Sequence, residues 1–246
     1  MRTPTKLATI TSLCWPLSAV HANAQDLNMG HCTDDPSVQP EDIISACTGF
    51  ISRRYQEGYA IQMVPSAMVY QAVAYERLGQ PEKAEGILKT VITHFPKYSG
   101  GWEALGELLE KQKGPGMLMS VVDAMIKANA GDAGVLNSAC WIRAKRGEQL
   151  DAALADCNES LRLRPGDTQT LDSRAFVWFR KGNFPQAIAG ANTVLTAKPN
   201  YASSLYVRGL AKLKSGDAAG GNADITAAKT ADTKIAGTYA AYGVGP

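Results

Sequence analysis

Histidine is scarce in this chain of 246 residues, which contains only three. His31 and His94 lie beyond the N-terminal segment and are too isolated for a histidine-based metal site or a catalytic triad. The HExxH, GxSxG, GxxxxGK(S/T) and GxGxxG motifs are also missing. We therefore expect no catalytic residues, no metal site and no cofactor, and we predict that the protein is not an enzyme. Carboxylates that only the folded chain brings together remain the alternative route to catalysis.

Beyond the N-terminus, the chain lacks any apolar run long enough to span a membrane. At the N-terminus, Arg2 and Lys6 precede a modestly apolar run at 7–20, and a small-x-small sequence follows it. We interpret residues 1–24 as a secretory signal peptide, cleaved after Ala24, that directs the chain to the periplasm or outside the cell by Gram-negative-type export. An uncleaved anchor is the alternative, although the run is short and diluted by threonine, serine and proline.

An excess of charge of one sign is absent as well. Removing Arg2 and Lys6 with the signal peptide lowers the formal net charge from +2 to zero. A neutral chain has no general attraction to nucleic acid or to an anionic membrane. We therefore expect no nucleic-acid partner and no membrane insertion after signal cleavage.

What the chain does contain is a pattern that recurs about every 34 residues. Its fourth position is large and apolar and its eighth is small, which draws an apolar stripe down one helix. A glycine then marks a turn, and a second helix carries an alanine and ends at a proline in three of the copies. The units begin near Pro65, Ser99, Ala133, Thr168 and Ala202.

Some units depart from this pattern. Arg143 and Lys212 occupy the eleventh position, where the other three units carry a large apolar residue. The last unit also has glycines at 220 and 221 in its second helix, and each glycine costs about 1 kcal/mol relative to alanine. We expect this last hairpin to be frayed.

The repeated pattern resembles the tetratricopeptide repeat (TPR) family over roughly residues 65–235. This resemblance implies an all-α, right-handed solenoid of helix-turn-helix repeats, with about five units plus N- and C-terminal capping helices. We divide the chain into the signal peptide at 1–24, a disulfide-pinned loop with a capping helix at 25–64, and the solenoid at 65–246. The segment 235–244 is expected to form the C-terminal cap.

Four cysteines remain after signal cleavage, and an even number in an exported chain suggests disulfides. Cys140 and Cys157 are equidistant from the turn of one hairpin, so their Cα atoms can approach within bridging distance. Cys32 and Cys47 would form the second bridge and pin a loop against a helix that starts near residue 40. Buried free thiols are the alternative for the pair in the hairpin, and the absence of CxxC disfavours a redox role.

The resemblance to TPR proteins also implies a concave groove lined by the first helix of each unit. The positions that face such a groove combine aromatic, amide and acidic side chains, which suits the binding of a peptide or a helix. The aromatic residues can instead pack against neighbouring helices or the C-terminal segment, and that alternative stays open. The candidate groove residues are Asn137, Trp141, Asp172, Phe176, Phe179, Tyr206, Glu103 and Glu107.

The leading hypothesis is therefore an envelope scaffold that binds a protein or peptide partner in this groove. One alternative is an accessory protein of cell-wall or protease machinery that binds glycan or a product peptide through the same aromatic residues. Another is a self-assembling structural protein, so an oligomer stays possible. The sequence does not identify the partner.

Overall fold

The computed structural model describes residues 30–57 and 63–246, and the predicted signal peptide lies outside them. The described part of the chain forms twelve α-helices and contains no strand. They are α1 (Pro40–Glu57), α2 (Val64–Arg77), α3 (Pro81–His94), α4 (Ser99–Lys113), α5 (Met117–Ala128), α6 (Ala133–Arg146), α7 (Leu150–Leu163), α8 (Thr168–Arg180), α9 (Phe184–Ala197), α10 (Ala202–Lys214), α11 (Ala218–Ala231) and α12 (Ile235–Ala241).

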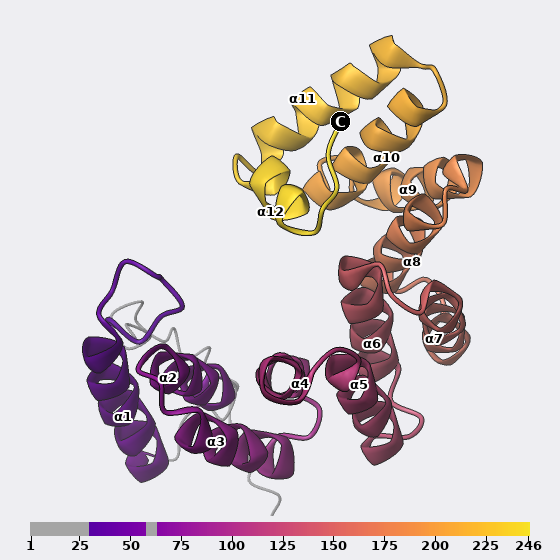
Figure 1. Cartoon of the computed structure of the whole chain (residues 1–246). Helices are drawn as coiled ribbons and strands as arrows, with labels where there is room; N and C mark the ends of the chain where they lie inside the picture. Colours follow the sequence, from indigo (N-terminus) through magenta and orange to yellow (C-terminus); the bar gives the residue numbers. More distant parts are fainter. Residues whose placement is uncertain (1–29, 58–62) are drawn as a thin grey trace, which may run out of the picture.

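Five consecutive helix pairs, from α2–α3 to α10–α11, form an open arc, with α1 at one end and α12 at the other (Figure 1). The first helices of these pairs begin within one residue of the predicted unit starts. The all-α solenoid predicted from the sequence is confirmed.

Aspartate side chains begin several of these helices. Asp132 Oδ1 accepts a hydrogen bond from the backbone N–H of Val135 at 3.1 Å, and Asp167 Oδ2 accepts one from Thr170 at 2.9 Å. A side chain in this position satisfies a backbone donor that the helix itself leaves unpaired. Short polar residues therefore set where α6 and α8 start.

The turn between α6 and α7 needs a glycine. Gly147 ends α6 with φ of 70°, a left-handed conformation that glycine adopts without steric cost. A Cβ atom there would also lie 1.9 Å from Arg180 Nη2. The predicted turn at Gly147 thus holds for two independent reasons.

The two faces of α6 belong to two different parts of the core. Val135 and Ile142 pack into a cluster that extends back through α5 and α4 to α2. Cys140 and Ala144 pack into a second cluster that continues to the C-terminal segment. Because one helix contributes to both clusters, α6 couples the two halves of the arc.

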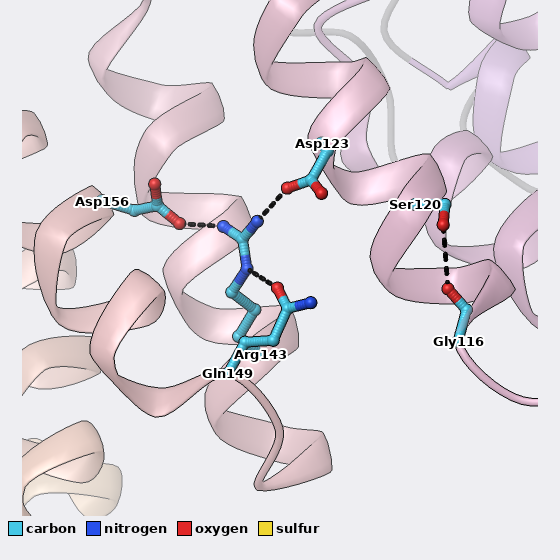
Figure 2. Close-up of polar contacts among 6 residues, drawn as sticks. All are labelled: Gly116, Ser120, Asp123, Arg143, Gln149 and Asp156. Carbon is cyan, nitrogen blue, oxygen red and sulfur yellow. Dashed lines mark hydrogen bonds and ion pairs between the residues drawn. The ribbon is translucent and has the colours of Figure 1, made fainter.

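Arg143 explains one departure from the repeat pattern. Its side chain is buried and forms ion pairs with Asp123 of α5 and Asp156 of α7, while its Nε donates to Gln149 Oε1 at 3.1 Å (Figure 2). A buried guanidinium requires such partners because an unpaired charge in the core is strongly unfavourable. Arg143 therefore ties three helices together where other units use apolar packing.

The expectation of a frayed last hairpin is wrong. Helices α10 and α11 are continuous, and their backbones approach so closely that a Cβ at Gly209 would lie 2.9 Å from the carbonyl oxygen of Gly221. The second departure, Lys212, forms an ion pair with Asp224 at 2.8 Å. The glycine that weakens α11 as an isolated helix is thus needed for its packing.

Two disulfides join the cysteine pairs expected from the sequence. Cys32 and Cys47 are bridged with an S–S distance of 2.07 Å, and Cys140 and Cys157 with 2.05 Å. The first bridge holds the N-terminal loop against α1, and α1 packs on α2. Arg77 adds to this contact, since its Nη2 donates to the carbonyl oxygens of Pro36 and Val38.

Candidate partner-binding groove

The first helices of successive repeats, α2, α4, α6, α8 and α10, pack against one another in order. They bring most of the predicted groove residues to neighbouring positions. Asn137 and Trp141 come from α6, Asp172, Phe176 and Phe179 from α8, and Tyr206 from α10.

The aromatic members of this set form a continuous cluster. The ring centroid of Phe176 lies 5.5 Å from that of Trp141 and 6.4 Å from that of Phe179. These separations are typical of favourable aromatic contacts. We call the group of Trp141, Phe176, Phe179 and Tyr206 the aromatic cradle.

The centre of the cradle is closed to solvent, whereas Trp141 and Phe179 are only partly buried. Phe176 and Tyr206 are 0% and 1% exposed, because α12 and the residue after it cover them. The Tyr239 ring lies 5.1 Å from Phe176 and 5.0 Å from Tyr206, and the Tyr242 ring lies 5.9 Å from Trp141. The expected C-terminal cap thus packs on the aromatic residues themselves, which is the alternative that the sequence left open beside an exposed groove.

A largely buried hydrogen-bond network joins α12 to the groove. The Ser203 hydroxyl donates to Asp172 Oδ2 at 2.6 Å and lies 2.7 Å from the Tyr239 hydroxyl, and Ser204 donates to Asp172 Oδ1. Burial raises the pKa of Asp172, while the two serine hydroxyls act in the opposite direction. Burial also raises the pKa of Tyr239 well above its usual value, and nearby Asp172 adds to this effect.

Sequence reasoning missed this network. Its members come from three helices, and Ser203, Ser204 and Tyr239 are not among the predicted site residues. The sequence contains one signal of this contact. Ser203 and Ser204 lie early in the fifth unit, and Asp172 lies early in the fourth unit, so stacking of the two units brings them together.

An open cleft of about 440 Å³ lies beside the network. Its walls combine hydrogen-bonding groups with aromatic surface, and Asn137 Oδ1 is buried without a hydrogen-bond partner in the described part of the chain. A buried acceptor left unpaired is unfavourable, so this atom weakens the packing of α6 beside the cleft. The lining residues are Asn137, Ser138, Trp141, Gln169, Asp172, Ser173, Tyr201, Ser203, Ile235, Thr238 and Tyr239.

The acidic residues of α4 are mostly neutralised by basic residues at the end of α6. Glu103 pairs with Lys145, and Glu110 pairs with Arg146 at 2.8 Å. Glu107 has no ion-pair partner among the described residues and is exposed. The surrounding protein nevertheless raises its pKa by desolvation, and the nearby Glu103 carboxylate acts in the same direction. Glu107 is therefore the one predicted acidic contact that stays free for a partner in this part of the groove.

Solved structures with the same arrangement of helices decide the fold. PilW, described as a widely conserved type IV pilus biogenesis factor, aligns over 74% of this chain and 88% of its own, with 16% identity and a TM-score of 0.52. The chain has the tetratricopeptide-repeat fold. A TPR protein from Parabacteroides merdae aligns over 82% of this chain and 85% of its own, with 17% identity and a TM-score of 0.53.

A third TPR protein, from Thermus thermophilus, aligns with 14% identity and a TM-score of 0.51 over 73% of this chain and 97% of its own. At these identities the likeness concerns the TPR fold, which typically serves protein–protein interaction without catalysis. No protein-family model matches the chain, and no curated protein matches it. Within residues 30–57 and 63–246, none of the TPR helices combines the length and hydropathy needed to cross a membrane.

Proposed function

We propose that this chain is an exported TPR scaffold, periplasmic or secreted, that binds a peptide or helix of an envelope protein on its concave side. The observation that carries the proposal is the open cleft lined by Asn137, Trp141 and Asp172. The sequence predicts these three residues as groove residues, and all three line one cavity.

The chemistry of the cleft suits a polypeptide. Asn137 lines the cleft, and a side-chain amide can exchange hydrogen bonds with the backbone of a bound segment. Trp141 is only partly buried and offers a rigid apolar surface next to it. Glu107 on the adjacent helix α4 adds a free negative charge, so a basic residue on the partner fits best at that end.

Two disulfides support export. All four bridged cysteines are buried, and such bonds persist in oxidising compartments rather than in the cytosol. The signal peptide that would direct this export lies outside the described residues.

The test is a crosslinked pull-down from envelope extract with the mature chain, 25–246, and three variants. Asn137→Ala and Trp141→Ala are each expected to lower recovery of the specific partner roughly fivefold or more, since both groups face the cleft. Asn222→Ala is the matched control, because Asn222 is exposed on α11 away from the cleft. Phe176 is unsuitable for this purpose because it is buried.

A partner that is retained equally by all variants would move the binding site away from the cleft. A partner lost only in Asn137→Ala and Trp141→Ala would support the proposal, provided that their unfolding midpoints match that of the control.

A glycan ligand is the second candidate, and one observation favours it. Around Trp141 the cleft presents neutral hydrogen-bonding side chains such as Gln169 and Ser173, a combination that suits sugar hydroxyls above an aromatic ring. Titration of the mature chain with cell-wall saccharides, followed by tryptophan fluorescence, tests this. A response that disappears in Gln169→Ala, which keeps the Trp141 reporter, would support the glycan; a flat response in the native chain would exclude it.

A further inference from the structure

We propose that α12 is an intramolecular ligand of the aromatic cradle, and that the partner of this groove displaces it with a short helix bearing two tyrosines on one face. This inference rests on the proposed function in that a partner binds the concave side. Ile235, Thr238 and Tyr239 of α12 line the cleft beside Asn137, so a partner that displaces α12 takes over the part of the wall that they form. It adds the chemistry of that partner and the way in which the chain regulates access to it.

Few side chains hold α12 on the cradle. Its buried residues are Ile235 and Tyr239, and most of its other positions are small and exposed. Tyr242 follows Tyr239 by three residues, so both rings lie on the same side and contact the cradle. The segment is thus attached through these two aromatic rings together with the buried side chains of Ile235 and Val244, as a bound peptide is held by a few anchors.

The cradle distinguishes tyrosine from phenylalanine. Ser203 donates its proton to Asp172 Oδ2, so the Ser203 oxygen is free to accept from the Tyr239 hydroxyl. A phenylalanine at this place would leave the Ser203 oxygen without this donor. The pair of Asp172 and Ser203 therefore selects a phenol.

The second tyrosine has its own contacts on the groove wall. Arg180 Nη1 donates to the backbone carbonyl of Tyr242 at 3.1 Å, and Lys145 Nζ lies 5.9 Å from the centre of its ring. A cation near the face of an aromatic ring is attracted to it. Helices α6 and α8 thus each supply one basic residue that fixes this position.

As an isolated helix, α12 is weak. It has seven residues, and its N-cap residue Lys234 makes no side-chain capping bond. Gly237 lies in the middle of α12, although a Cβ atom at this position would meet nothing within 4 Å. Short helices with an interior glycine form poorly alone, so α12 is suited to detach locally while the array stays folded.

A tethered ligand lowers the apparent affinity of any competing partner. The apparent affinity is the intrinsic affinity multiplied by the fraction of molecules in which the tethered ligand is detached. Loosening α12 should therefore strengthen binding in trans, and tightening α12 should weaken it.

The experiment uses the full mature, disulfide-bonded chain and a fluorescent peptide with the sequence of residues 232–246, followed by anisotropy. Tyr239→Phe in the protein removes the hydroxyl that contacts Ser203 and is expected to tighten peptide binding roughly fivefold. Gly237→Ala in the protein makes α12 a better helix and is expected to weaken peptide binding by about the same factor.

Gly86→Ala is the matched control for Gly237→Ala. Gly86 lies in α3, is exposed, and a Cβ atom added to it would meet nothing within 4 Å. This change strengthens a helix far from the cradle and should leave peptide binding unchanged. A second probe, in which both tyrosines of the peptide are alanine, should not bind any of the proteins.

Equal peptide affinity for the native chain, Tyr239→Phe and Gly237→Ala would overturn the proposal, as would equal binding of the alanine peptide. These results are separable from the pull-down. Loss of an envelope partner in Asn137→Ala tests the cleft, whereas opposite shifts in peptide affinity test α12.

Discussion

The guanidinium of Arg143 and the carboxylate of Asp156 form a buried ion pair that joins α6 to α7. It stands at a repeat position that three other units fill with large apolar residues. An unpaired buried charge is strongly unfavourable, whereas a buried ion pair contributes little net stability. Removing one member of the pair should therefore destabilise the fold, and replacing both members with apolar residues should not.

Arg143→Leu is expected to lower the free energy of unfolding by about 3 kcal/mol, because it leaves Asp156 without its cation. The double variant Arg143→Leu/Asp156→Leu should recover most of this loss. Urea unfolding at neutral pH gives the comparison. If the losses of unfolding free energy in Arg143→Leu and Asp156→Leu simply add in the double variant, the two side chains are not energetically coupled.

Removal of the bridge within the third hairpin should destabilise the array. Cys140 and Cys157 are separated by 17 residues in sequence, and a closed loop of this size contributes about 3 kcal/mol. We expect Cys140→Ala/Cys157→Ala to lose at least this much in urea unfolding. Cys32→Ala/Cys47→Ala is the comparison, and its loss should be confined to the N-terminal loop and α1. A Cys140→Ala/Cys157→Ala variant that unfolds at the same urea concentration as the native chain would contradict the prediction.

The buried carboxyl of Asp172 should make stability depend on pH. Its pKa is raised in the folded protein, so the folded state holds the proton more tightly than the unfolded chain. This contribution to stability is fully present below about pH 3.9 and is lost as pH rises through the raised pKa. The difference in unfolding free energy between the native chain and Asp172→Asn should therefore fall as pH increases. A difference that is constant with pH would show that the carboxyl titrates normally.

Phe176 and Val73 occupy the same position of their respective repeats, and their exposure differs. Phe176 is fully buried under α12, whereas Val73 is 38% exposed. Phe176→Ala is expected to cost about 3–5 kcal/mol because it opens a cavity in the core. Val73→Ala should cost less than about 0.5 kcal/mol, as exposed substitutions do. Thermal or urea unfolding of both variants tests this; equal losses would mean that the burial of Phe176 is not maintained in solution.

The sequence predicted the helical array well because its signals are local and repeated. The apolar stripe, the turn glycine such as Gly147 and the capping aspartates each act within one hairpin, so their spacing sets the helix bounds. The pairing of Cys140 with Cys157 followed from the same local geometry.

The sequence predicted the groove less well because its surface depends on contacts between distant segments. Tyr239 reaches Phe176 across more than a full repeat, and no periodic signal reports such a contact. The partners of Arg143 likewise come from helices before and after its own. The prediction for the hairpin of Gly221 was wrong for the same reason, since this glycine permits the approach of another backbone.

The Cys140–Cys157 bridge also bears on proteolysis. The turn that it spans contains Gln149, which is exposed and has φ of 49°, and exposed polar turns are preferred sites of cleavage. A cut there would leave α6 and α7 joined through sulfur, so the two fragments would migrate together until a reductant was added. Outside the cytosol, where proteases are present and thiol reductants are few, a single nick would therefore not divide the molecule.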